Sequence, residues 1–398
     1  MRAAFLLPQG VYMNGNSLGP LSLAAQSAVE RRMRQWQHSA VEAWDEWFAL
    51  AERLSPALAR LVGAQPAEVI ATGTTTGNLH AALAGLYRPA GRRRHVLALA
   101  SDFPSDLYAL KSWTDRHGAE LRLVGAATDG SDPPEVVAEA EIEAALSDEI
   151  ALVWLPVVSY RAGQRFDTAR LTAAAHQAGA LVGWDAAHSI GALPHALHDE
   201  GADVAVWCSY KYLNGGPGAP GGLFLHQRHH ERMPGLPGWW GHEPASRFGM
   251  RPSFQAASGA AGWQTSTPSV LALAGLQGAL ALFEEVTVEE VRARSLLLTD
   301  RLIAALDKSA PEVELVTPRE HRRRGGHVTV RHEAAGAISV ALRERGVVPD
   351  HRPPDLLRFA PVAMYTTEEE VDRTVEALHD VLAGNDLVAT ELRPDRVP

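Results

Sequence analysis

The sequence contains a single cysteine, Cys208, among 398 residues, so no disulfide bond can form within one chain. Basic residues are also in deficit, with 37 Lys and Arg against 47 Asp and Glu and a formal net charge of −10. A nucleic-acid-binding protein would show a basic face, so we expect no nucleic-acid partner. The two basic runs, 92–94 and 322–324, lie in polar segments next to glycine and are expected to be solvated loops.

Long apolar runs are missing as well. The longest, VLALAGLQGALALF at 270–283, falls short of the roughly 20 residues that span a bilayer and has the length of a buried core helix. The apolar patch near the N-terminus is broken by Pro8 and Gly10 and is too short for a secretory signal. These absences predict a cytoplasmic protein with no membrane partner.

What is present is an ordinary globular composition, 46% hydrophobic and 21% charged, in a chain longer than one core usually holds. Apolar runs are predicted as strands at 95–100, 151–160, 181–188, 203–209 and 221–226, with helical patterns at 134–148 and 169–180 between them. This alternation predicts an α/β fold with a mainly parallel central sheet, which binds ligands at the carboxyl ends of its strands. The pattern strand, helix, strand, helix over 327–384 predicts a smaller C-terminal α/β domain.

Two charged residues lie in or just after predicted strands. Lys211, in SYKY, comes after strand 203–209; it is either a surface lysine at a strand end, which is common, or a nucleophile. Asp185 lies in strand 181–188, where a carboxylate is unfavourable unless it meets a cation. The protonated ring nitrogen of pyridoxal 5'-phosphate is such a cation. The segment between the two residues is long enough for one crossover, which would place them on nearby strand ends.

Three further features suit the same cofactor, although each has an ordinary alternative. ATGTTTGN (71–78) precedes a helical pattern and can bind a phosphate or be a threonine-capped helix. Phe103 follows strand 95–100 and can stack on a flat ring or pack in the core. His188 can contact the cofactor or be a hydrogen-bonded core histidine.

A glycine-rich run, GPGAPG at 216–221, matches the pattern of a dinucleotide-binding loop. That loop needs a helix directly after it, whereas a strand is predicted here. Pro217 and Pro220 also lack the backbone N–H groups that would bind phosphate. The run therefore predicts a tight connection between two strands of the sheet.

Six segments together resemble kynureninase, a pyridoxal-phosphate enzyme of fold type I, the aspartate-aminotransferase type. They are YMNGNSLGP (12–20), FPSD (103–106), WDAAHSIGALPHALHDEGAD (184–203), WCSYKYLNGGPG (207–218), GWWGH (238–242) and RFAPV (358–362). The resemblance implies a large cofactor-binding domain at 51–285 and a small domain at 286–398, to which the N-terminal segment 1–50 contributes. It also implies a homodimer with shared active sites.

The resemblance implies a role for each cofactor residue. Lys211 would hold pyridoxal phosphate covalently, Asp185 would pair with the ring nitrogen, and His188 would lie near the ring substituents. Tyr210 would contact the phosphate and act as an acid or base. The remaining cofactor contacts would come from Thr75, Thr76, Phe103 and Asp106.

Three more residues are implied at the substrate and two at the cofactor of the neighbouring subunit. Arg358 would bind the amino-acid carboxylate through its fork of donors, and Ser17 and His38 would line the pocket for the aryl ring. Trp239 and Thr267 would contact the cofactor of the neighbouring subunit. The implied reaction is hydrolysis of L-kynurenine, or of its 3-hydroxy form, to anthranilate or 3-hydroxyanthranilate and L-alanine, in tryptophan catabolism and NAD biosynthesis.

Several other functions are compatible with parts of the same pattern. A class V aminotransferase, or a kynureninase-like enzyme of secondary metabolism, stays open within the fold. A cysteine desulfurase would need a nucleophilic cysteine on a loop after the lysine, whereas Cys208 precedes Lys211 in a predicted strand. The presence of Lys211, Asp185 and Arg358 argues against a scaffold without catalysis.

Two histidine-rich stretches offer metal ligands, but neither predicts a metal site. The first lies in a polar segment after a strand and the second in a charged loop. The residues concerned are His195, His198 and Asp199 in the first stretch, and His226, His229 and His230 in the second.

Overall fold

The computed structural model describes residues 1–126 and 132–384, so the end of the predicted small domain, 385–398, lies outside it. Seven strands form the main sheet: β4 (Val69–Ala71), β5 (His95–Leu99), β6 (Leu121–Val124), β7 (Ile150–Pro156), β8 (Leu181–Asp185), β9 (Val204–Cys208) and β10 (Gly221–Leu225). Their order is β4-β10-β9-β8-β7-β5-β6. All neighbours pair in parallel except β10, which is antiparallel to β9 and β4. The predicted α/β fold with a mainly parallel sheet is confirmed.

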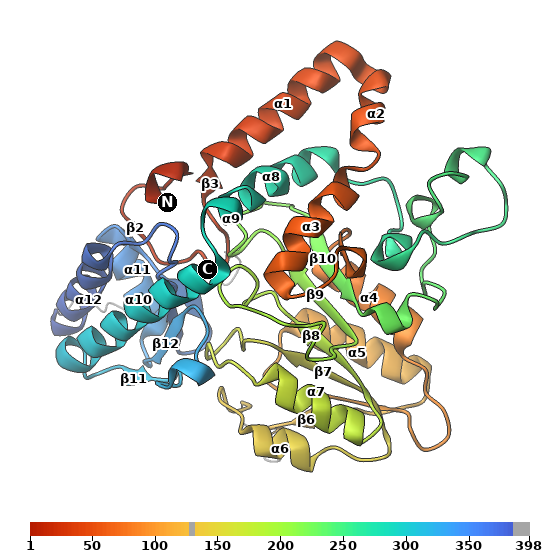
Figure 1. Cartoon of the computed structure of the whole chain (residues 1–398). Helices are drawn as coiled ribbons and strands as arrows, with labels where there is room; N and C mark the ends of the chain where they lie inside the picture. The colour runs from red at the N-terminus through yellow and green to blue at the C-terminus, as the bar shows by residue number, and fades with distance from the viewer. Residues whose placement is uncertain (127–131, 385–398) are drawn as a thin grey trace.

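The main sheet is covered on both faces. Every residue of β7, β9 and β10 is buried, as their continuous apolar sequences predict for strands enclosed by helices. The crossover from β7 to β8 and the one from β5 to β6 run in opposite directions along the sheet, so right-handed connections place their helices on opposite faces. Figure 1 shows α7 (Thr168–Gln177) on one face and α4 (Thr75–Leu86) and α5 (Pro104–Arg116) on the other.

Further elements surround this sheet. β10 follows the glycine-rich run directly, which confirms the predicted strand-to-strand connection. In Figure 1, α1 runs alongside α8. The bounds of these other elements are β1 (Phe5–Leu6), β3 (Leu21–Ser22), α1 (Leu23–Ser39), α2 (Trp44–Trp47), α3 (Leu50–Val62), α6 (Glu139–Ala144), α8 (Val270–Leu280) and α9 (Leu282–Glu285).

A second, antiparallel sheet has the order β11-β12-β15-β14. Its strands and helices are β11 (Glu314–Leu315), β12 (Val328–Arg331), β14 (Asp350–Arg352), β15 (Leu356–Phe359), α10 (Val288–Ser309), α11 (Ala335–Glu344) and α12 (Glu368–Ala383). Thr367 and Glu370 cap α12 reciprocally. Nearby, β13 (Val347–Val348) pairs with β2 (Val11–Tyr12), so the N-terminal segment reaches this part of the molecule.

Two hydrophobic cores correspond to the two sheets. The second core contains Val11 and Met13 together with apolar residues from 298 to 381. The first core contains Phe5 and Leu50 from the N-terminal segment, and Val288 and Val291 from the start of α10. The long helix α10 therefore passes from one core to the other.

Two local predictions were wrong. The helix predicted at 134–148 is reduced to α6, because the backbone N–H and C=O of Val137 are both bonded to the side chain of Gln164. The basic runs are not wholly solvated. Arg324 is 1% exposed and pairs with Asp300, and Arg93 donates to backbone carbonyls on two separate segments.

Within the described residues, no single helix combines the length and hydropathy needed to cross a membrane. The helical segments 270–285 and 288–309 meet the length and hydropathy criteria only when they are counted together, and they are bent by 83° relative to each other.

Candidate active site

A cavity of about 480 Å³ opens at the edge of the main sheet where β5, β8 and β9 end. Parallel strands bring their carboxyl ends to one edge, so residues far apart in the sequence meet there. The structure places ten of the predicted residues on its wall: Ser17, Thr75, Thr76, Phe103, Asp106, Asp185, His188, Tyr210, Lys211 and Arg358. Other lining residues include Asn16, Thr74, Ser105, Tyr160, Cys208, Gly221 and Arg352.

Lys211 lies in the turn after β9, and its Nζ is 2.9 Å from Nε2 of His188. Burial, together with the positive charge of Lys211, holds the pKa of His188 well below its ordinary value. The imidazole is therefore neutral at physiological pH, and its Nε2 lies within hydrogen-bond distance of the Lys211 amine. Its Nδ1 has no hydrogen-bond partner among the described residues.

Three buried carboxyl groups gather beside this lysine. Asp185 ends β8 and accepts the backbone N–H of Ala187 at 2.7 Å, while Asp106 on α5 accepts the indole N–H of Trp154 at 3.2 Å. Burial raises the pKa of both groups, and Asp185 raises that of Asp106 further. Burial and Asp185 also raise the pKa of Asp102 to about 8. Crowded acids of this kind suit a cationic partner, and a protonated pyridine nitrogen meets that need.

The threonine loop forms the start of helix α4. Thr74 caps this helix by accepting the backbone N–H of Gly77 at 3.1 Å, which leaves the first N–H groups of the helix free to bind an anion. Gly221 lies opposite, where an added Cβ would be 3.0 Å from backbone atoms of Thr74 and Thr75. Only glycine keeps this cradle open, so the residues present suit a phosphate group.

Arg358 lies in β15 and is fully buried. Its guanidinium pairs with Asp350 and donates to the backbone carbonyl of Tyr160 and to the Ser17 hydroxyl at 3.3 Å. The guanidinium of Arg352 reaches the same Asp350 carboxylate at 3.2 Å and the same hydroxyl at 3.3 Å. Burial lowers the pKa of Arg358 to about 10, so it stays charged at neutral pH. Two cations thus share one carboxylate, which leaves a positive charge for a substrate carboxylate.

Asp350 and Arg352 were missed by the sequence reasoning. In the antiparallel pair of β14 and β15, Asp350 is the cross-strand partner of Arg358, and Arg352 lies two residues further along the same face. The sequence feature that could have indicated them is the short segment DHR (350–352), which precedes LLRF. It becomes readable only once the two strands are known to pair.

Three predicted residues do not line this cavity within the described chain. His38 is exposed in the last turn of α1, and Thr267 is exposed just before α8. Trp239 is 42% exposed and donates its indole N–H to the backbone carbonyl of Arg247.

The fold and the cavity together define a pyridoxal-phosphate-dependent enzyme of fold type I. A solved structure of a C-DES mutant, with glycine covalently linked to its PLP cofactor, superposes with a TM-score of 0.83, 22% identity and coverage of 96% of this chain and 99% of that one. The cysteine desulfurase CsdA from Escherichia coli gives a TM-score of 0.78, 20% identity and coverage of 96% and 97%. Identities this low establish the shared fold alone.

Sequence comparison identifies the family. Residues 291–378 match the model of the kynureninase C-terminal domain. A kynureninase from Geobacillus thermodenitrificans is 41% identical over 384 residues, which cover 95% of this chain and 90% of that protein. One from Shouchella clausii is 40% identical, with coverage of 94% and 88%. The chain belongs to the kynureninase family, and the resemblance drawn from its motifs is confirmed.

Proposed function

We propose that this chain hydrolyses L-kynurenine, or its 3-hydroxy form, to anthranilate or 3-hydroxyanthranilate and L-alanine, within tryptophan catabolism that feeds NAD biosynthesis. One observation carries the proposal. A single cavity has the lysine, the buried acids and the anion cradle in one part and the paired guanidinium groups of Arg352 and Arg358 in another. It can therefore hold the cofactor and an amino-acid carboxylate at the same time.

The cofactor would be held at both ends. Asp185 would pair with the ring nitrogen and keep a proton there, and the helix start at Thr75 and Thr76 would bind the phosphate. Phe103, which packs edge-on against Tyr160 at 5.2 Å, would flank the ring. When bound, pyridoxal phosphate supplies an electron sink for the carbon atom from which a proton is removed.

The proton transfers fall to two neighbouring residues. Lys211, once free, would take the α-proton of the substrate at its Nζ, with neutral His188 holding that nitrogen in position. Burial, with Cys208 nearby, raises the pKa of the Tyr210 phenol, so Tyr210 stays protonated at neutral pH. Tyr210 would then donate a proton after water has added to the γ-carbonyl and the β,γ carbon–carbon bond breaks.

Desulfurase chemistry has little support in this cavity, although two solved structures of similar fold are cysteine desulfurases. Cys208 lies in the buried strand β9, and burial raises the pKa of its thiol. A thiol in that state is a poor nucleophile. Aminotransferase activity is the alternative within the fold, and its products are different from those of hydrolysis.

We also propose that the chain acts as a cytoplasmic homodimer. Exposed aromatic side chains support a subunit interface, since Trp36 is 61%, Phe248 is 54% and Trp239 is 42% exposed. In this proposal His38, Trp239 and Thr267 complete the active site of the partner. We keep the predicted large domain at 51–285 and small domain at 286–398, to which the segment 1–50 contributes. The second core, built from residues 298–381 with Val11 and Met13, supports a separate small domain, although residues 288, 291 and 360–365 pack in the first core.

The proposal is tested with purified, cofactor-loaded protein and each of the two substrates. Formation of L-alanine together with anthranilate or 3-hydroxyanthranilate in equal amounts is expected, without any 2-oxo acid as co-substrate. Turnover that requires a 2-oxo acid and leaves the aryl ketone chain intact would instead establish an aminotransferase. Comparison of kcat/KM for the two substrates then decides which kynurenine is preferred.

A further inference from the structure

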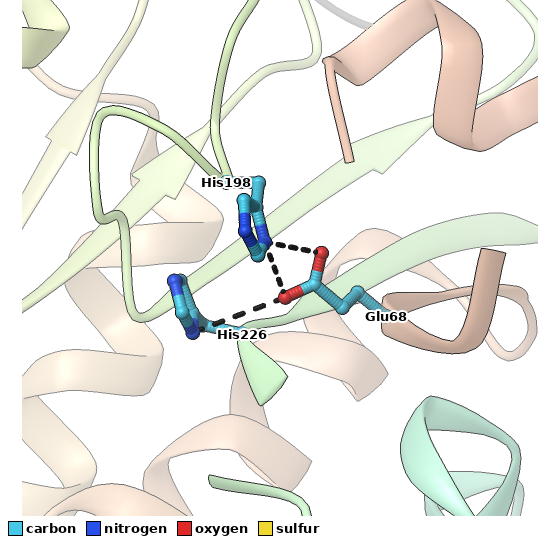
Figure 2. A group of neighbouring side chains, drawn as sticks. All are labelled: Glu68, His198 and His226. Atoms are coloured by element: carbon cyan, nitrogen blue, oxygen red, sulfur yellow. Dashed lines mark hydrogen bonds and ion pairs between the residues drawn. The ribbon is translucent and has the colours of Figure 1, made fainter. Parts of the chain in front are cut away.

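Three side chains from distant parts of the sequence meet at the edge of the main sheet that is opposite the cavity. Glu68 immediately precedes β4, His226 immediately follows β10, and His198 lies in the loop before β9 (Figure 2). These strands are neighbours in the sheet, so the three residues tie together the ends of β4, β10 and β9. The other ends of the same strands carry the threonine loop, Gly221 and Lys211.

The carboxylate of Glu68 is fixed in position by hydrogen bonds from two backbone N–H groups. It is fully buried, and its Oε1 and Oε2 accept backbone N–H groups of Gln227 at 2.7 Å and Gln65 at 2.9 Å. His198 approaches from the front, with Nδ1 at 2.9 Å from both carboxylate oxygens. Nδ1 of His226 is 3.8 Å from Oε1, which is too far for a hydrogen bond.

The position of His226 leaves two acceptor atoms close together, Nδ1 of His226 and Oε1 of Glu68. Its Nδ1 accepts the backbone N–H of Arg228 at 3.2 Å, so that nitrogen carries a lone pair and no proton. The single lone pair of this nitrogen is directed at the Arg228 N–H, so no hydrogen atom lies between Nδ1 and the Glu68 carboxylate oxygen 3.8 Å away. A cation placed between the two atoms would turn this unfavourable contact into an attractive one.

We propose that Glu68, His198 and His226 bind a divalent transition-metal ion, with Zn²⁺ as the best fit. Two imidazoles and one carboxylate form a common zinc ligand set, and the three ligand atoms all lie within 4.8 Å of one another. The backbone donors behind Glu68 provide the outer contacts that orient a metal ligand. The side chain of His198 is 23% exposed, which gives the ion a path of entry and leaves a position for water.

Binding requires one local adjustment. The two imidazole rings are nearly parallel, with centroids 4.9 Å apart and planes inclined by 9° (Figure 2). A metal lies in the plane of each imidazole that binds it, so one ring must turn about its Cβ–Cγ bond, a soft rotation. His226 can do so by giving up its bond to Arg228 and its hydrogen bond to the backbone of His198. Because the cluster is remote from the cavity, the ion would clamp three strands and would take no part in the reaction.

The experiment uses the cofactor-loaded enzyme after removal of metals with a chelator. Zn²⁺ is titrated by calorimetry, Tm is measured with and without Zn²⁺, and Co²⁺ is added to read the ligand-field bands of a bound ion. His198→Gln and His226→Gln remove one ligand each. His230→Gln is the matched control, because it removes a histidine of the same loop whose ring bonds only to the carbonyl of Leu225 among the described residues.

One Zn²⁺ per chain is expected, with a rise in Tm of several degrees at saturation. Both ligand variants should weaken binding at least tenfold, and His230→Gln should bind as the parent does. Equal kcat with and without Zn²⁺ is expected, since the ion does not reach the active site. Absence of stoichiometric binding would overturn the proposal, and so would binding that both ligand variants retain. A His229→Gln variant tests whether Zn²⁺ binds instead at His229 and Asp203, which are 2.7 Å apart. Loss of binding in that variant alone would place the ion there and contradict the assignment.

Discussion

Asp350 faces Arg358 across the antiparallel pair of β14 and β15, and its carboxylate accepts from the guanidinium groups of both Arg358 and Arg352. The shared carboxylate of Asp350 orients two guanidinium groups whose positive charges would otherwise repel each other. It neutralises only one of the two charges. Both guanidinium groups line the cavity, so the remaining positive charge would keep a buried arginine available to an amino-acid carboxylate in the proposed reaction.

Replacing Arg358 by lysine should raise KM and lower kcat/KM by about 10- to 100-fold, because one ammonium group cannot reproduce a planar fork fixed at three acceptors. Steady-state kinetics with L-kynurenine measures the effect. Arg343→Lys is the control, since Arg343 lies on α11 and is not among the residues that line the cavity. An unchanged KM would move the carboxylate site elsewhere.

Arg352 should act on substrate binding more than on chemistry. Arg352→Gln keeps a donor for Asp350 but removes the surplus charge, so KM is expected to rise about tenfold while kcat changes little. The same kinetics, extended to kynurenine analogues without the α-carboxylate, checks the reason. If Arg352 binds the substrate carboxylate, the variant and the parent should have the same KM for such an analogue.

Lys211→Ala should abolish anthranilate formation, with a loss of at least about 10⁴-fold in kcat, because no other described amine lines the cavity. Absorbance of the purified variant provides a second measurement. The band of a lysine-bound cofactor should be replaced by that of the free aldehyde. Turnover retained by this variant would exclude Lys211 from the reaction.

Asp102 should make the cofactor-free protein less stable as pH rises. Its folded-state pKa is about 8 against an ordinary 3.8, so the folded chain keeps a proton that the unfolded chain has already released. This stability is complete below about pH 4 and is lost as pH rises through about 8. Asp102→Asn should remove that loss, which would raise the free energy of unfolding at pH 9 by more than about 1 kcal/mol. Urea unfolding of both proteins at pH 6 and pH 9 measures the difference, and equal slopes with pH would contradict it.

Five of the seven strands of the main sheet could be predicted because each is a short, continuous apolar run, as in β5 and β9. The other two, β4 and β6, were not predicted, because β4 has only three residues and β6 is interrupted by Arg122. Asp185 and Lys211 followed from the same pattern, since a charge at the end of such a run is conspicuous. Asp350 and Arg352 could not be found in this way. Their meaning depends on which strands pair, and no local pattern in the sequence states that.

The same limit explains why Glu68, His198 and His226 were not grouped from the sequence. His198 and His226 were assigned to separate stretches, each grouped with its sequence neighbours. In the structure they meet a glutamate that lies 130 positions before one of them. Spacing along the chain detects ligand sets only when the ligands lie on one element, whereas the proposed ligands here come from two strand ends and a loop.

The proposed sharing of active sites between subunits gives the last prediction. Lys211→Ala lacks the amine of its own cavity, while Trp239→Ala would lack a residue donated to the partner. If both changes impair the same shared site, each homodimer is weakened, but a mixed dimer contains one cavity with both residues intact. Unfolding and refolding the two variants together should therefore restore about a quarter of the parental activity from a random mixture of subunits. Refolding each variant alone controls for the treatment. Activity in the mixture no higher than the mean of the separate samples would place Trp239 outside a shared site.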